Sequence, residues 1–374
     1  MRTLSDGMQI AAPESLTDGE TTFDVVTIPD FSGPAALRFE AQVLFLLASW
    51  MERREAGMRE IPFRLACIGE PPASVRWLAD RAEASVAVME PVGIIGSNYL
   101  NKLRGLEIGG EHPARLLIDA DTLVLGDLRP LRGLGRCLAA APTGRPRIVA
   151  EEWMAIYAEL GMPAPKERME SLAGMLGQEV PNLSAREVEE AAAMFPYYNA
   201  GVVFVGREVP LRELWQEHAL AIAEGARRTG NTNKAICNCD QVSLATTIQA
   251  LRARGIPFRD LPLAYNVRPR QIQCRQVPLG EVRIFHARKF MHGIRPGPGG
   301  VERALEGYAW HKVGVAWSEV RAWRDPFPRK VARALREALP ARRDARRLRA
   351  IGRRLHERFV RPALVAGRSL MAPD

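Results

Sequence analysis

The sequence is poor in cysteine and has no long apolar run. Its 374 residues include five cysteines, which are odd in number and scattered, and this argues against a disulfide framework and for a reducing compartment. The longest apolar run, from Val43 to Trp50, is far shorter than the ~20 residues that a membrane-spanning helix needs. The first twenty residues lack the apolar stretch of a secretory signal. These absences predict a cytoplasmic protein.

Most of the chain also lacks net charge. The total is +9, but residues 329–368 hold fourteen Lys or Arg against three acids, a net of +11 that leaves the other residues at −2 (9 − 11). We therefore expect no nucleic-acid partner for the main body. Within 329–368, four large apolar residues are spaced as one side of a basic helix, namely Leu348, Ile351, Leu355 and Phe359. Such a helix can lie on an anionic membrane surface, pack as an ordinary solvated helix or bind nucleic acid; the first reading predicts a peripheral position on the inner face of the membrane.

Apolar runs of strand length alternate with helical patterns over residues 22–300. The expected strands are Phe23–Asp30, Phe63–Gly69, Ala84–Glu90, Ala114–Asp121, Asn199–Gly206 and Val282–Phe290. The expected helices are Pro34–Glu55, Pro72–Ala82, Asn98–Leu106, Leu211–Ala226 and Asp240–Arg254. This alternation predicts a doubly wound α/β fold with a mixed, mostly parallel sheet flanked by helices.

Three segments fall outside that alternation. Residues 150–194, which are interrupted by prolines, show no strand pattern and predict a helical insertion. Residues 1–21 read as a flexible leader, and residues 301–374 as a helical, basic C-terminal region. We therefore expect one catalytic domain over 22–300 with a tail on each side.

Two carboxylates follow the most apolar of the expected strands. Asp119 and Asp121 come directly after Leu116, Leu117 and Ile118, at the strand end where open α/β sheets bind ligands. At this spacing on extended chain both side chains point the same way. Paired hard oxygen ligands suit Mg²⁺ or Mn²⁺. Two acids can also simply end a strand, but the motif itself holds no basic partner for them, which favours a metal.

Five segments in order resemble glycosyltransferase family eight, a family with the GT-A fold. They are "NYLNKL" (98–103), "DADTLVLGDL" (119–128), "YYNAGVVFV" (197–205), "CDQVSLAT" (239–246) and "LPLAYNV" (261–267). A sixth, "IFHARKF" (284–290), stands where the family has a strand that ends in a metal-binding histidine. The resemblance implies a GT-A-type fold and a metal-dependent hexosyltransferase that uses a UDP-sugar donor with retention of configuration.

The resemblance also assigns roles to residues of this chain. His286 would be the third metal ligand, and an imidazole beside two carboxylates favours Mn²⁺. Lys102, Asn199 and Gly201 would bind the donor. Asp240 and Gln241 would form the catalytic pair, with the Gln241 amide near the anomeric carbon; Asp240 suits a helix N-terminus for structural reasons as well.

The chain departs from the family pattern at two places. After His286 the usual Gly and Lys-Pro-Trp are missing, so Lys289 is the expected cation for the diphosphate, ahead of Arg288. After the first strand there is no tyrosine to stack on uracil; Phe31 would stack instead, and Asp30 would hold the base edge.

The acceptor of such a glycosyltransferase is unknown; a glycan or a glycolipid would fit. Two other functions are alternatives to a glycosyltransferase. A sugar-phosphate nucleotidyltransferase would need a Gly-rich basic loop after the first strand, and "PDFSGPAALRF" has one glycine. A degenerate GT-A domain acting as a membrane-associated scaffold would fit the altered segment after His286, but the intact acid pair argues against it.

Overall fold

The computed structural model describes residues 21–93, 98–143, 148–170, 193–237, 239–268, 277 and 281–286. Lys289, Arg288, residues 1–20 of the expected leader, and the whole of 301–374, including the basic segment 329–368, lie outside the described residues. Among the described residues, no helix is both long enough and apolar enough to span a bilayer.

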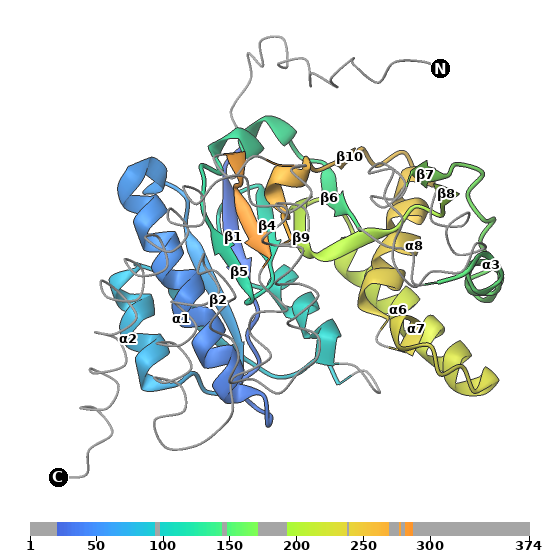
Figure 1. Cartoon of the computed structure of the whole chain (residues 1–374), viewed down its shortest axis with the longest axis horizontal. Coiled ribbons are helices and arrows are strands. Elements are labelled where there is room, and N and C mark those ends of the chain that lie inside the picture. The colour runs from blue at the N-terminus through green and yellow to red at the C-terminus, as the bar shows by residue number, and fades with distance from the viewer. Residues whose placement is uncertain are drawn as a thin grey trace, which may run out of the picture.

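A seven-stranded sheet forms the centre of the molecule (Figure 1), in the order β10-β6-β9-β4-β1-β2-β3. Its strands are β1 (Phe23–Thr27), β2 (Phe63–Ile68), β3 (Ser85–Met89), β4 (Ala114–Ile118), β6 (Leu138–Pro142), β9 (Tyr198–Gly206) and β10 (Phe258–Asp260). All neighbouring pairs are parallel except the two that involve β9, which runs against β4 and β6. The expected mixed, mostly parallel sheet is confirmed.

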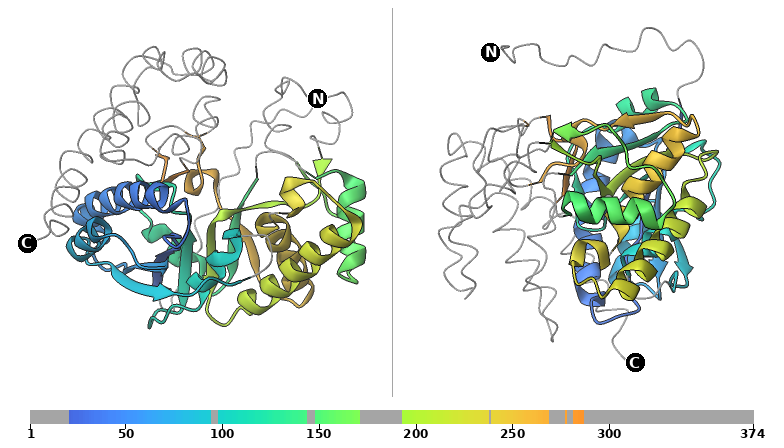
Figure 2. Two further views of the ribbon diagram at one scale, coloured as in Figure 1. Left: turned by 90° about the horizontal axis from the view of Figure 1, so that it is seen from below. Right: turned by 90° about the vertical axis from the view of Figure 1, so that its right-hand side faces the viewer.

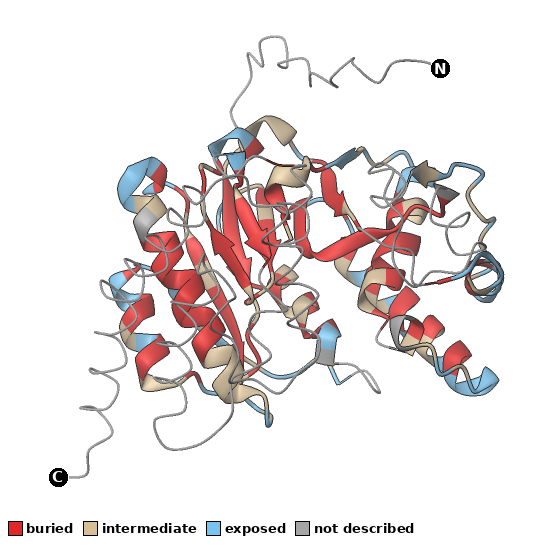
Figure 3. Cartoon of the chain, in the orientation of Figure 1, coloured by how far each residue is buried: buried red, intermediate tan, exposed pale blue. Residues whose placement is uncertain are grey.

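Helices cover both faces of this sheet. They are α1 (Ala36–Arg53), α2 (Ala73–Arg81), α3 (Ala150–Glu159), α6 (Leu211–Thr229), α7 (Lys234–Cys237) and α8 (Asp240–Ala253). Helices α1 and α2 (blue) lie on one side and α6 and α8 (yellow) on the other, as Figure 2 shows. Two buried apolar clusters fill the space between the sheet and the helices on its two faces. β1 contributes to both, because Val25 belongs to one cluster and Val26 to the other. The buried residues in Figure 3 therefore follow the strands and the inner sides of the helices.

Several short elements were not expected from the sequence. These include β5 (Thr122–Val124) as well as β6 and β10, which extend the main sheet. β11 (Ile284–His286) lies within the expected strand Val282–Phe290, but it pairs with β5 in a separate two-stranded sheet. Asn98–Leu106, expected as a helix, is a 3-10 helix (η2), as are η3 (Arg129–Leu134) and η4 (Leu263–Tyr265), and α1 continues into a π-helical turn, η1 (Arg54–Met58).

The expectation that 150–194 holds no strand is wrong. Besides α3, this segment contains β7 (Met169–Glu170) and β8 (Ala193–Met194), which pair antiparallel; residues 171–192 between them lie outside the described residues. Two-residue strands carry no measurable alternation, so only the pairing itself reveals them.

Strands of both directions bring candidate site residues to one end of the main sheet. The parallel strands β1 and β4 finish at this end, and β9, because it is reversed, begins there. The residues that follow β1 and β4 therefore meet the first residues of β9, which positions the site described next.

Candidate metal centre

Asp119 and Asp121 lie in a tight turn between β4 and β5. The Thr122 amide and hydroxyl both donate to the Asp119 carbonyl, at 3.1 and 2.7 Å. The Asp119 amide donates to the Gly201 carbonyl at 2.9 Å, which fixes the turn against β9. The two carboxylates thus come together because the chain turns, and not because they project from extended backbone as we predicted.

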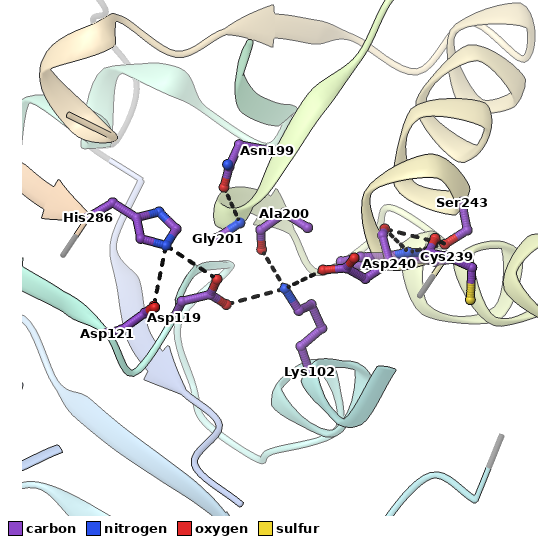
Figure 4. A network of polar contacts seen from close by, with 11 residues as sticks. Lys102, Asp119, Asp121, Asn199, Ala200, Gly201, Cys239, Asp240, Ser243 and His286 are labelled. Atoms are coloured by element: carbon purple, nitrogen blue, oxygen red, sulfur yellow. Dashed lines mark hydrogen bonds and ion pairs between the residues drawn. The ribbon is translucent and has the colours of Figure 1, made fainter. Parts of the chain in front are cut away.

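His286 reaches the same place from the far end of the described chain. It closes β11, whose antiparallel pairing sets His286 opposite Thr122. Its Nε2 lies 3.3 Å from an Asp121 oxygen and 3.8 Å from an Asp119 oxygen (Figure 4). One ligand atom from each of the three residues lies within 4.8 Å of the others. The structure therefore brings together the three side chains that the sequence analysis selected as metal ligands.

The surroundings of His286 suit metal coordination. Its Nδ1 lies 2.9 Å from Asn266 Oδ1, so a proton on Nδ1 leaves the lone pair on Nε2. Nε2 is buried and has no hydrogen-bond partner among the described residues. A buried imidazole nitrogen without a hydrogen-bond partner, beside two carboxylates, is a donor set that suits a divalent cation. Asn266 was missed as a functional residue, although it stands in the quoted segment 261–267.

Gly201 leaves room for this centre. A Cβ at position 201 would lie 2.5 Å from His286 Cε1, 2.7 Å from Asp119 Oδ2 and 2.8 Å from Asn199 Oδ1. Asn199 Oδ1 accepts a hydrogen bond from the Gly201 amide at 2.7 Å, whereas Asn199 Nδ2 is buried without a partner among the described residues. β9 thus contributes a glycine at a position where any side chain would clash, and an amide donor without a partner among the described residues, beside the three candidate ligands.

Lys102, on η2, is the cation of the site. Its Nζ lies 3.2 Å from Asp119 Oδ1, 3.2 Å from Asp240 Oδ2 and 3.1 Å from the Ala200 carbonyl, which matches the three protons of an ammonium group. Burial would lower the pKa of Lys102, but the Asp119 and Asp240 charges outweigh burial and raise it above its ordinary value. Asp119 therefore has a basic partner, supplied by a segment 17 residues away in sequence.

Asp240 opens α8 without capping it. The N-cap residue is Cys239, and no side chain bonds the free amides there. Asp240 directs its carboxylate to Lys102 instead (Figure 4), so the capping role that competed with a site role is not used. Gln241 follows on the same helical turn and is half-buried.

Asp30 and Phe31 follow β1 at the same edge of the sheet. The amide and hydroxyl of Ser32 donate to Asp30 Oδ1 at 3.0 and 2.6 Å, and Asn101 Nδ2 donates to Asp30 Oδ2 at 3.1 Å. Phe31 is half-buried against the α1-side apolar cluster. Asn101, the residue before Lys102, also accepts from the Val92 amide at 3.0 Å. Sequence reasoning passed over Asn101, which joins the Asp30 loop to the helix that carries Lys102.

Comparison with known proteins gives one family match. A family model described as the Rhodobacterales glycosyltransferase domain matches residues 64–252. No curated protein matches the chain in sequence.

Similar solved structures share little sequence with this chain. The glycosyltransferase GlyE of Streptococcus pneumoniae TIGR4 has 14% identity and a TM-score of 0.39; the match covers 71% of this chain and 55% of that one, so the chain spans about half of GlyE. Mouse xyloside xylosyltransferase 1 in its apo form has 13% identity over 74% of this chain and 100% of that one, with a TM-score of 0.42. The galactosyltransferase LgtC in complex with donor and acceptor sugar analogs has 15% identity over 87% and 99%, with a TM-score of 0.40.

Proposed function

The chain belongs to the Rhodobacterales glycosyltransferase domain family, and on that basis we propose that it uses a divalent metal to transfer a hexose from a nucleotide-diphosphate donor, a UDP-sugar by resemblance, to an acceptor. The observation that supports a metal site is the convergence of Asp119, Asp121 and His286. The buried Nε2 of His286 has no hydrogen-bond partner among the described residues. The mixed donor set of two carboxylates and an imidazole favours Mn²⁺ over Mg²⁺. When bound, the ion would offset the charge that develops on the departing diphosphate.

The neighbouring residues fit the binding of the donor sugar. Asn199 Nδ2, buried and unpartnered among the described residues, would donate to a sugar hydroxyl. The lack of a side chain at Gly201 avoids a clash with Asn199 and Asp119. Lys102 holds a positive charge between Asp119 and Asp240, and to bind the donor it would exchange one of its three present contacts for a donor oxygen. Asp240 and Gln241 would lie at the reacting carbon, in agreement with the family resemblance.

The residues proposed to bind the nucleotide part of the donor are chosen from the family resemblance and from their position in the sheet. Asp30 and Phe31 stand at the same strand edge as the acid pair, which suits the base of the donor, and Lys289 would hold the diphosphate. Retention of configuration follows from the same resemblance to family eight, and we assign no covalent nucleophile.

The deciding experiment compares two Asp→Asn variants of one segment. Asp121→Asn removes one ligand of the proposed centre, so Mn²⁺-dependent hydrolysis of a UDP-sugar panel should be lost while the thermal unfolding temperature is kept. Asp127→Asn is the matched control, because Asp127 lies six residues on and bonds Arg129 at the surface. Wild-type turnover in Asp121→Asn would end the metal proposal. A wild-type protein that binds UDP without turning over any donor would favour the scaffold function.

The acceptor is proposed to be a glycan or glycolipid held at an anionic membrane surface. The support is the sequence of 329–368, whose arginines would contribute about 1 kcal/mol each near such a surface. Truncation at Asp325 should spare donor hydrolysis and abolish binding to phosphatidylserine vesicles at low salt. If the full-length protein does not bind those vesicles, the proposal of a lipid-linked acceptor loses its support.

A further inference from the structure

Cys239 has an unusual backbone conformation for a residue next to the metal centre. Its φ of 43° and ψ of −9° are left-handed, and it is one of two described residues other than glycine with a positive φ; the other, Glu83, is exposed. A left-handed conformation is costly for any residue that has a Cβ. Strain of this kind persists only where the surrounding structure imposes it, and it concentrates at functional sites.

Several hydrogen bonds hold the backbone around Cys239 in place. The Cys239 carbonyl accepts from the Ser243 amide at 2.8 Å and from the Ser243 hydroxyl at 2.5 Å. The Cys239 amide donates to the Ile236 carbonyl at 3.0 Å, at the end of α7. Trp215 Nε1 donates to the Asp240 carbonyl at 3.1 Å and to Ser243 Oγ at 2.9 Å. The first turn of α8 is thus held by Trp215 of α6 and by the end of α7. Figure 4 shows the part of these contacts that joins Cys239 to Ser243.

The Asp240 carboxylate points away from the end of α8 and toward Lys102. A usual helix N-cap is extended, and the acids beside it face the free amides of the first turn. Here the left-handed cap precedes a residue whose carboxylate leaves the helix end and meets Lys102 at 3.2 Å. Lys102 therefore divides its charge between Asp240 and Asp119. Without Asp240, that ammonium would bear on Asp119 alone and would compete with a cation for it.

We propose that Cys239 is a positioning residue whose left-handed backbone directs Asp240 onto Lys102, and that Asp240 thereby keeps Asp119 available to the metal. The metal part rests on the proposed function, whereas the backbone part does not. Glycine is the ordinary residue for this conformation. The cysteine side chain is fully buried in the cluster on the α6 and α8 face, which gives the chain a reason to carry a Cβ here.

The test uses Cys239→Gly, Cys239→Ala and Cys239→Val, each with Asp240 intact and with Asp240→Asn, and measures Mn²⁺ affinity by calorimetry. Glycine accepts a positive φ, so Cys239→Gly should bind Mn²⁺ much as wild type does. Valine disfavours it strongly, so Cys239→Val should bind about tenfold more weakly, as expected when the support of a ligand is lost. In the Asp240→Asn background the three variants should differ no further, because the carboxylate that they place is gone.

Three results would overturn the proposal. The first is a wild-type Mn²⁺ affinity in Cys239→Val, and the second is an equally weak Mn²⁺ affinity in Cys239→Gly and Cys239→Val. The third is a loss of affinity from Cys239→Val that is just as large when Asp240 is replaced by Asn. Thermal unfolding tests the backbone part even if Cys239→Val does not fold or wild type binds no Mn²⁺. Cys239→Gly should then unfold at a higher temperature than Cys239→Ala, the reverse of the usual order, and the usual order would refute the strain.

Discussion

Replacing Gly201 by alanine is expected to damage the metal centre while leaving the fold in place. The new Cβ would lie 2.5 Å from His286 Cε1 and 2.7 Å from Asp119 Oδ2. Ordinary van der Waals contact begins at 3.4 Å, so these groups must retreat by 0.9 Å (3.4 − 2.5) and 0.7 Å (3.4 − 2.7). Metal–ligand distances tolerate only about 0.2 Å. Mn²⁺ affinity should therefore fall about tenfold to a hundredfold, and donor turnover by roughly a hundredfold.

Gly206→Ala is the matched control for this experiment. Gly206 lies in the same strand and is equally crowded, with the new Cβ 2.8 Å from the Arg136 carbonyl oxygen, but it is at the opposite end of β9. Both variants should unfold at a lower temperature, and only Gly201→Ala should lose Mn²⁺ affinity in calorimetric titration. Unchanged Mn²⁺ affinity in Gly201→Ala, or an equal loss in both variants, would refute the assignment of the centre.

Three further predictions concern other buried polar groups. Asn266→Ala should weaken Mn²⁺ binding about tenfold, because the His286 ring loses the hydrogen bond that orients it. Asn266→Asp should bind Mn²⁺ as wild type does, because it accepts the same hydrogen bond. Equal losses of affinity in both variants would show that Asn266 does not orient His286. Asp24 is fully buried and forms ion pairs with His112 at 2.7 Å and with Arg64 at 3.1 Å. Asp24→Asn should therefore lower the free energy of unfolding in urea by about 3 kcal/mol; a loss below about 1 kcal/mol would contradict this. Burial lowers the pKa of His218 to about 4, below its unfolded value of about 6.5. The folded state therefore resists protonation, and stability should fall by up to about 3 kcal/mol between pH 6.5 and 4, a slope that His218→Gln should reduce.

The longer elements were predictable because each carries its own pattern. Within β4 and β9, Leu116–Ile118 and Val202–Val205 are continuous apolar runs, as strands buried on both faces require. By contrast, Thr122–Val124 and Phe258–Asp260 have three residues each, too few to show a period. Leu138–Pro142 is rich in alanine, a weak strand former, and owes its conformation to pairing with β9.

The candidate site divides in the same way. Asp119, Asp121 and His286 could be selected because each stands at the end of an apolar strand. The partners of Lys102 could not, because they come from three segments that meet only in the folded chain. The left-handed turn at Cys239 carries no sequence signal either, since glycine, the residue that would announce it, is absent there.

The pairing of β5 with β11 has a consequence for the newly made chain. His286 follows its β5 partner Thr122 by 164 residues (286 − 122), a gap that a ribosome crosses in about 8 to 33 s at ordinary rates of synthesis. During that interval the nascent chain holds Asp119, Asp121 and Lys102 but not yet His286. If the proposed centre is correct, such a chain should bind Mn²⁺ poorly and leave nucleotide sugars intact until His286 has been made and β11 has paired with β5.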